Sequence, residues 1–228
     1  MKFFKPIRSK ESNKLFVLRP ERDRLVILGS MTLWLLLVGI GLAFLWDYEN
    51  TPGVAAKPPA LWPVESRIQR AQDKATLVML AHPHCPCTRA SIGELALLMA
   101  HSQGRLTAHV LFLKPEGFSE QWEQTDLWQS AASIPGVEVS IDDEGIEARR
   151  FHATTSGQAN LYDADGRLLF SGGITSARGH SGDNAGRSAI ESILNAGTAD
   201  RSETFVFGCP LFDENSECQN SKHESNEH

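Results

Sequence analysis

Charged residues are absent from Leu25 to Trp46, a run of 22 residues. At about 1.5 Å per residue, a helix of this length spans roughly 33 Å, enough to cross a hydrocarbon core of about 30 Å. The apolar region of a cleaved secretory signal is normally only about 7 to 15 residues long. We therefore expect a single-pass signal-anchor, with cleavage near the small residues at 54–56 as the alternative.

Basic residues are scarce after this run. Residues 1–24 carry eight Lys and Arg against three Asp and Glu, so the remaining 204 residues carry a net charge of −11. Because Lys and Arg beside a membrane segment stay on the cytoplasmic side, we expect a cytoplasmic N-terminus and a periplasmic main domain at a bacterial inner membrane. The acidic exported part argues against nucleic-acid binding.

Cysteine is also rare, and all four cysteines follow the apolar run. In an exported compartment, disulfides form and persist, so Cys85, Cys87, Cys209 and Cys218 are candidates for redox chemistry. The apolar run itself contains no Cys, His, Asp or Glu and cannot relay electrons. A redox cycle would therefore need a membrane or periplasmic partner for recycling.

The composition divides the chain into five parts. We expect a cytoplasmic basic tail over 1–24, a transmembrane helix over 25–46, a Pro- and Ala-rich linker over 47–62, a folded domain over 63–198 and a C-terminal extension with a polar tail over 199–228. Pro and Gly in the linker disfavour both packing and helix formation.

Hydrophobic periodicity predicts an α/β domain. Short apolar or alternating runs predict strands, and helical spacing predicts helices. The Asp165-Gly166 pair favours a hairpin, and Ser91 with Glu94 resembles a capping box, so the helix after the cysteine pair could begin only at Ser91. The expected strands are 76–81, 106–113, 137–141, 159–162 and 168–171, and the expected helices are 64–73, 91–99, 125–133 and 185–194.

This order is a parallel βαβ unit, an antiparallel hairpin and a final helix, with a cysteine pair between the first strand and its helix. It resembles the thioredoxin fold over about residues 64–197. Four shorter segments resemble bacterial membrane-tethered thioredoxin-like proteins of the RedB type: His82–Ser91, Phe151–Tyr162, Gly172–Asn184 and Phe207–Pro210.

The resemblance implies a thiol-disulfide oxidoreductase that acts on a periplasmic thiol or disulfide protein. Its redox centre would be the disulfide Cys85–Cys87, without another cofactor. Two features depart from thioredoxin. A single residue, Pro86, separates the cysteines where thioredoxin has two, and Gly157 stands where thioredoxin has the cis-proline that faces its dithiol.

The cysteine turn also predicts the roles of its residues. A thiol at the point where a strand feeds a helix N-terminus is stabilised as a thiolate, so Cys85 is the expected attacking thiol and Cys87 the resolving thiol. His82 and His84, if charged, would lower the pKa of Cys85, and neutral His84 could accept its proton. A ring closed through Pro86 alone would be strained, which favours its reduction.

Two alternatives compete with this hypothesis. His82, His84, Cys85 and Cys87 offer two imidazoles and two thiolates, which suit copper or zinc, so a metal-binding or metal-delivery module is the main alternative. Closing such a site would require help from outside the turn, from Cys209 or from His180. The other alternative is a structural disulfide or a pair of buried thiols without redox activity, as in an interaction scaffold that kept the fold but lost the chemistry.

Two further segments bear on the site. The alternatives for Cys209 are a loop disulfide with Cys218, a place beside the dithiol as a further resolving thiol or ligand, or neither of these. The loop over 175–184 carries Arg178 and His180, and it is either a solvated connection or a border of the site.

Overall fold

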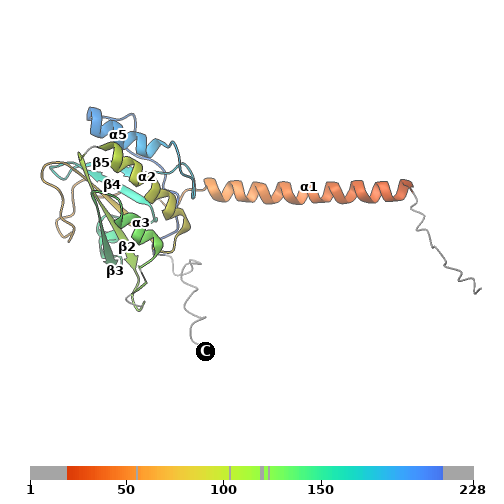
Figure 1. Ribbon diagram of the computed structural model, residues 1–228, viewed down its shortest axis with the longest axis horizontal. Helices are drawn as coiled ribbons and strands as arrows, with labels where there is room; N and C mark the ends of the chain where they lie inside the picture. The colour runs from red at the N-terminus through yellow and green to blue at the C-terminus, as the bar shows by residue number, and fades with distance from the viewer. Residues whose placement is uncertain (1–19, 55, 103, 119–120, 123, 213–228) are drawn as a thin grey trace, which may run out of the picture. The chain divides into compact units, whose positions relative to one another are not determined.

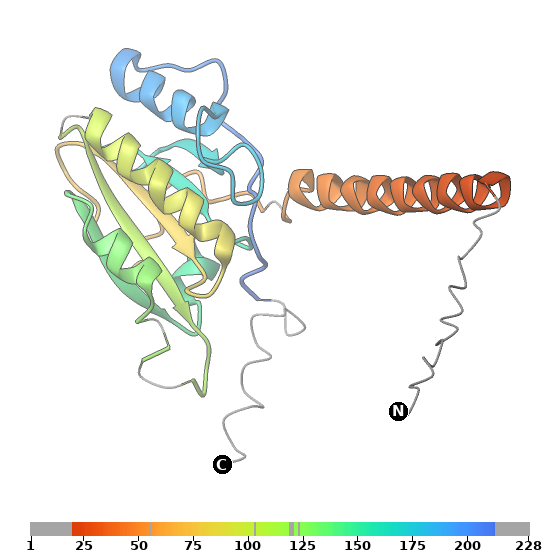
Figure 2. The ribbon, with the colours of Figure 1, turned by 45° about the vertical axis from the view of Figure 1, so that its right-hand side comes forward.

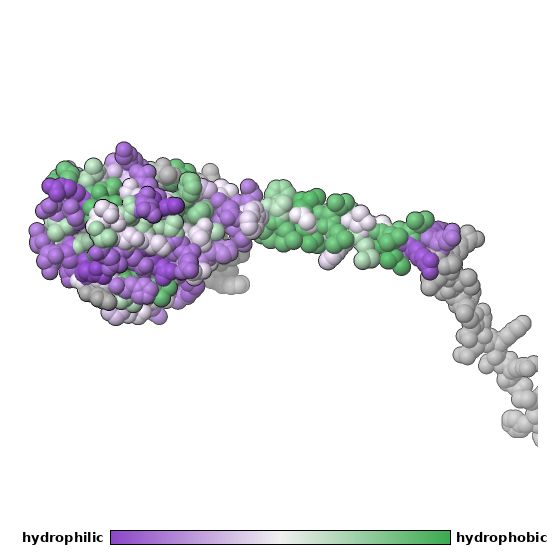
Figure 3. All heavy atoms as spheres, turned by 90° about the horizontal axis from the view of Figure 1, so that it is seen from above, coloured by the Kyte–Doolittle hydropathy of each residue, from purple (hydrophilic) through white to green (hydrophobic). Residues whose placement is uncertain are grey.

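The computed structural model describes residues 20–212, except residues 55, 103, 119, 120 and 123. The chain forms two compact units, Met1–Leu45 and Trp46–His228. Helix α1 (Pro20–Asn50) begins before the apolar run and ends after it. Its apolar side chains are exposed, and it is long and apolar enough to cross a membrane (Figure 3).

The second unit is built on a five-stranded mixed sheet with the strand order β3-β2-β1-β4-β5 (Figures 1 and 2). Strands β1, β2 and β3 are parallel, whereas β4 is antiparallel to β1 and β5 is antiparallel to β4. The predicted βαβ unit and hairpin are therefore confirmed. The strands are β1 (Ala75–Ala81), β2 (Leu106–Lys114), β3 (Val137–Asp143), β4 (Gln158–Tyr162) and β5 (Leu168–Gly172).

Within the part of the chain that the structure describes, four helices accompany the sheet, and three of them were predicted. They are α2 (Pro86–Ser102), α3 (Asp126–Ala132), α4 (Ile146–Arg150) and α5 (Ala185–Ala196). Asn184 caps the start of α5 and Gly197 ends it in the left-handed conformation, as its sequence predicts. The short α4 was missed; the carboxylate of Asp142 accepts the N–H groups of Glu147 and Ala148 in its first turn.

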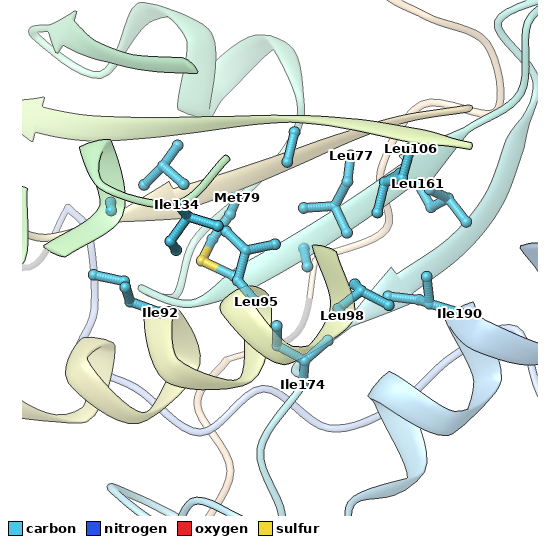
Figure 4. Packing of buried hydrophobic residues seen from close by; sticks show 14 of the residues in the cluster. Leu77, Met79, Ile92, Leu95, Leu98, Leu106, Ile134, Leu161, Ile174 and Ile190 are labelled. Carbon is cyan, nitrogen blue, oxygen red and sulfur yellow. The ribbon is translucent and has the colours of Figure 1, made fainter. Parts of the chain in front are cut away.

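Alternate residues of the central strand β1 face opposite sides of the sheet. Leu77 and Met79 pack with side chains of α2 and α5, among them Leu95 and Ile190 (Figure 4). On the other face, Val78 and Leu80 pack with Phe151, Tyr162 and Leu211. Burial on both faces explains why β1 is a continuous apolar run, and it fixes the end of β1 where the cysteine turn begins.

The helix predicted over 64–73 is wrong, because this segment consists of turns and bends. The Ser66 hydroxyl and the Arg67 N–H both donate to the buried carboxylate of Glu147, over 2.7 and 3.1 Å. The Ala71 N–H donates to the Thr76 hydroxyl over 3.0 Å. Tertiary acceptors thus satisfy donors that a helix would have used within itself.

The segment predicted as a linker, 47–62, belongs in part to the fold. Its first residues continue α1 to Asn50. The Gly53 N–H then donates to the Val206 carbonyl over 2.8 Å, and the Tyr162 hydroxyl donates to the Pro59 carbonyl over 3.1 Å. Because Pro lacks an N–H, this stretch stays extended and bonds to neighbouring segments instead.

The described part of the C-terminal extension, residues 199–212, also packs on the domain. The Thr204 N–H donates to the Ser171 carbonyl over 3.2 Å, and the Leu211 N–H donates to the Thr154 carbonyl over 2.9 Å. This segment carries Cys209 back across the sheet towards the loop that precedes β4.

The close approach of α5 to the end of β5 depends on Gly186, since a Cβ there would overlap the Gly173 carbonyl. We expect Gly186→Ala to lower the free energy of unfolding by about 1–3 kcal/mol, the usual cost of overpacking. Gly93→Ala in α2 is the matched control, because its Cβ would meet nothing closer than the Ser181 hydroxyl oxygen at 4.0 Å; it should raise stability by about 0.5–1 kcal/mol. Urea unfolding of the full chain in detergent measures both, and equal effects would contradict the packing argument.

Candidate active site

The cysteine pair lies at the point where β1 ends and α2 begins. Residues 82–85 form a turn that the Cys85 N–H closes by donating to the His82 carbonyl over 3.1 Å. Pro86 is the first residue of α2, where its missing N–H costs no helical hydrogen bond. Cys85 therefore sits directly at the helix N-terminus, and Cys87 lies in the first turn.

The alternative start of this helix at Ser91 is wrong. Ser91 and Glu94 both lie inside α2, and Glu94 is buried. Its carboxylate accepts the Gly182 N–H over 2.7 Å and the Asn184 side-chain amide over 3.1 Å, so it is not available for a capping box. The same carboxylate lies 3.2 Å from the Arg187 guanidinium and ties the loop before α5 to α2.

Cys85 is completely buried, and its sulfur lies 2.9 Å from the sulfur of Cys209. A disulfide bond measures about 2.05 Å, so this contact is a hydrogen bond between two sulfurs. The hydrogen bond with Cys209 and then the one with Cys87 lower the pKa of Cys85 strongly, and they outweigh the opposing effect of burial. The helix N-terminus favours a thiolate here too.

Cys87 differs from Cys85 although only Pro86 separates them. Its hydrogen bond with Cys209 lowers its pKa, but the hydrogen bond with Cys85, burial and the negative charge of Cys85 raise it, and the net shift is upward. Its side chain is 6% exposed. The turn thus holds one sulfur that favours the thiolate and one that retains its proton.

The two histidines of the turn do not both act as expected. His82 is buried, and burial lowers its pKa to about 4, although attraction to Cys85 acts in the opposite direction. It is therefore neutral at pH 7 and supplies no positive charge to Cys85. His84 packs against Trp122 with the rings tilted by 51° and their centroids 4.1 Å apart, and its Nε2 lies 3.1 Å from the Trp122 carbonyl.

One ring nitrogen of each histidine already has a protein partner, since the His84 backbone N–H donates to His82 Nδ1 over 3.2 Å and His84 Nε2 contacts the Trp122 carbonyl. Among the residues that the structure describes, no group of three or more His, Cys, Asp or Glu side chains is arranged to hold a metal ion. The donor set proposed for copper or zinc does not converge on one point.

The loop before β4 forms the opposite side of the site. The Ser156 hydroxyl accepts the His82 N–H over 2.8 Å and shares a 2.8 Å hydrogen bond with the Thr88 hydroxyl. Gly157 has φ +88, and a Cβ there would lie 2.8 Å from the Ser91 hydroxyl oxygen. Every peptide bond in the described residues is trans. Sequence reasoning named Gly157 but missed Ser156, whose only signal is its place beside that glycine.

Cys209 is held against this loop. The Ser156 N–H donates to the Cys209 carbonyl over 2.8 Å, and a Cβ at Gly208 would overlap the Ser156 carbonyl. Arg178 donates from Nη1 to the Gly208 carbonyl over 2.7 Å. The structure thus brings Cys209 to the cysteine pair, with Arg178 behind it.

Two predicted residues have other positions. His180 is exposed, and its Nδ1 lies 3.0 Å from the Arg178 carbonyl on its own loop. Cys218 lies outside the described residues, so a disulfide between Cys209 and Cys218 stays a prediction.

The depressed pKa of His82 gives a pH-dependent stability. An unfolded histidine titrates near 6.5, so the unfolded chain binds the proton first as the pH falls. The free energy of unfolding should therefore decrease from about pH 6.5 towards pH 4, and His82→Gln should remove that part of the decrease. Urea unfolding of the wild type and of His82→Gln between about pH 6.5 and pH 4 measures this difference, and buried His109 contributes equally to both proteins. If the free energy of unfolding depended on pH identically in the two proteins, His82 would not be buried as a neutral group.

No protein-family model and no curated protein matches the chain. Among solved structures, it is similar to a hypothetical protein from Sinorhizobium meliloti 1021, with a TM-score of 0.53 and 20% identity over 71% of this chain and 93% of the other. It is also similar to an uncharacterized conserved protein from Geobacillus kaustophilus, with a TM-score of 0.50 and 16% identity over 73% of this chain and 94% of the other. Such identities bear on the fold alone. With its parallel βαβ unit, antiparallel hairpin and final helix, the chain has a thioredoxin-like fold.

Proposed function

We propose that this protein is a membrane-anchored thiol-disulfide oxidoreductase of the RedB type. The observation that carries the proposal is the placement of Cys85 at the N-terminus of α2, in hydrogen-bonding contact with two further thiols. The stability of a buried structural cysteine does not require a helix N-terminus and neighbouring thiol donors around its sulfur. A nucleophilic thiolate does require them, because helix N-terminal N–H groups and thiol donors stabilise its charge.

The different pKa shifts of the two sulfurs support the roles proposed for them. The Cys85 thiolate attacks a sulfur of a substrate disulfide, and the first substrate sulfur leaves as a thiolate. Cys87 then gives up its proton and attacks the Cys85 sulfur, so the second substrate sulfur leaves. Two electrons pass to the substrate, and the protein is left with a Cys85–Cys87 disulfide.

This mechanism requires that the substrate disulfide reach the sulfur of Cys85. Cys85 has no exposed surface, and the loop that carries Cys209 covers it. A substrate disulfide must therefore arrive at the edge where Cys209 is half-exposed, and this loop must move aside before attack. Since α1 contains no cysteine, it cannot exchange disulfides with the site, and a separate dithiol protein must reduce the enzyme again.

The proposed reaction predicts a specific loss. Cys85→Ser should reduce thiol-disulfide exchange with a fluorescent glutathione disulfide to the uncatalysed rate, because serine forms no nucleophile at neutral pH. Cys218→Ser is the matched control and should keep the wild-type rate. Full-length protein in detergent suits both assays.

Two results would contradict this proposal. Cys85→Ser with wild-type exchange would place the chemistry elsewhere. Stoichiometric copper or zinc in the untagged, reduced protein, lost in Cys85→Ser, would instead support the metal-binding alternative with His82, His84, Cys85 and Cys87.

The proposed orientation has its own test. Alkaline phosphatase folds to its active form only where disulfides form, so its fusion after His228 should be active in bacterial cells. The matched fusion after Arg24, before the apolar run, should be inactive because the basic segment stays in the cytoplasm. The reverse pattern would place the cysteines in the reducing cytosol and would remove the basis for a periplasmic role.

A further inference from the structure

Cys209 is the cysteine of the site that solvent reaches most easily. Cys85 is 0% exposed and Cys87 is 6% exposed, whereas Cys209 is only half-buried. An incoming thiolate attacks the disulfide sulfur that it can reach. A partner protein therefore meets Cys209 before either sulfur of the Cys-Pro-Cys turn.

The fold also favours a bond between Cys85 and Cys209. Their sulfurs are 2.9 Å apart, and a shift of roughly 0.9 Å would bring them to the length of a disulfide, about 2.05 Å. The loop that carries Cys209 is held in this place at two points, by the Ser156 N–H and by the Arg178 guanidinium. A small movement of side chains is enough.

A disulfide between Cys85 and Cys87 would require a larger change of structure. Cys85 immediately precedes α2 and Cys87 is its second residue. Their thiols are in hydrogen-bonding contact, but a disulfide between them would close a strained ring through Pro86 alone and distort the first turn. The Cys85–Cys209 bond leaves that turn intact.

We propose that Cys209 is a third redox thiol. It displaces Cys87 from the disulfide with Cys85, so that the oxidised protein rests with a Cys85–Cys209 disulfide. This inference rests on the proposed function of Cys85 as the attacking thiol. By this inference, the enzyme is reduced again through the sulfur of Cys209 in the C-terminal segment, and not through the turn alone.

The transfer is an internal exchange that needs no external oxidant. The Cys209 thiolate attacks the Cys85 sulfur, the bond between Cys85 and Cys87 breaks, and Cys87 leaves as a thiolate that takes up the proton lost by Cys209. A thiolate of the recycling dithiol protein then attacks Cys209, and Cys85 leaves. The second thiolate of that protein displaces Cys209, so two electrons enter the enzyme.

Peptide mapping distinguishes the two disulfides. Trypsin cleaves after Lys74, Arg89, Arg201 and Lys222, which places Cys85 and Cys87 in peptide 75–89 and Cys209 in peptide 202–222. Full-length Cys218→Ser protein in detergent is reduced, oxidised with glutathione disulfide, quenched with acid and alkylated before digestion. Mass spectrometry should show peptide 75–89 linked to peptide 202–222.

Variants in the same background sharpen the test. Cys87→Ser should keep the linked peptides, and Cys209→Ser should lose them and show only a disulfide within peptide 75–89. Reduction of oxidised Cys209→Ser by dithiothreitol should be about tenfold slower than that of its parent, because its disulfide is buried. Circular dichroism confirms that each variant is folded.

The possible failures are distinguishable. A disulfide only within peptide 75–89 of the parent, with unchanged reduction in Cys209→Ser, would overturn the role of Cys209 and leave exchange through Cys85 intact. Wild-type exchange in Cys85→Ser would overturn the proposed function, and this inference with it.

Discussion

A hydrogen bond from the Ser156 N–H to the Cys209 carbonyl joins the two loops that enclose the cysteines, and the geometry of the site depends on it. The loops approach closely because Gly208 has no side chain to collide with the Ser156 carbonyl. The Ser156 hydroxyl also accepts the His82 N–H of the cysteine turn. One serine thus connects the end of β1, the start of β4 and the C-terminal segment.

Hydrogen bonding and burial compete at this site, and the outcome differs from one group to the next. Burial alone raises the pKa of a thiol and lowers that of a histidine. At His82 burial prevails, so the imidazole is neutral, whereas at Cys85 hydrogen bonds from two thiols and the helix N-terminus prevail. The charge in this buried turn therefore resides on sulfur and is stabilised by neutral donors, without a charged histidine.

The sequence was sufficient to predict the elements whose signals are local. β1 and β2 are apolar runs buried on both faces, and α5 has a cap, a stop and helical spacing in its own residues. The predictions were wrong where contacts with residues far away in the sequence determine the local structure. Glu147 takes the donors of Ser66 and Arg67 and prevents a helix at 64–73, and Glu94 bonds across to the loop before α5 and does not cap α2.

The same reason explains what could be known of the site. The spacing of Cys85 and Cys87 is visible in the chain, but the contact with Cys209 joins residues far apart in sequence, and no short-range pattern encodes it. It forms because the C-terminal segment pairs with the sheet near Ser171 and then returns to the loop before β4. A thiol buried deeply enough to be surrounded by donors is, for that reason, hidden from a protein partner. A third sulfur at the surface, in contact with the buried one, reconciles acidity with access in the recycling half of the proposed cycle, since the enzyme can be reduced again through Cys209 without exposing Cys85 to solvent.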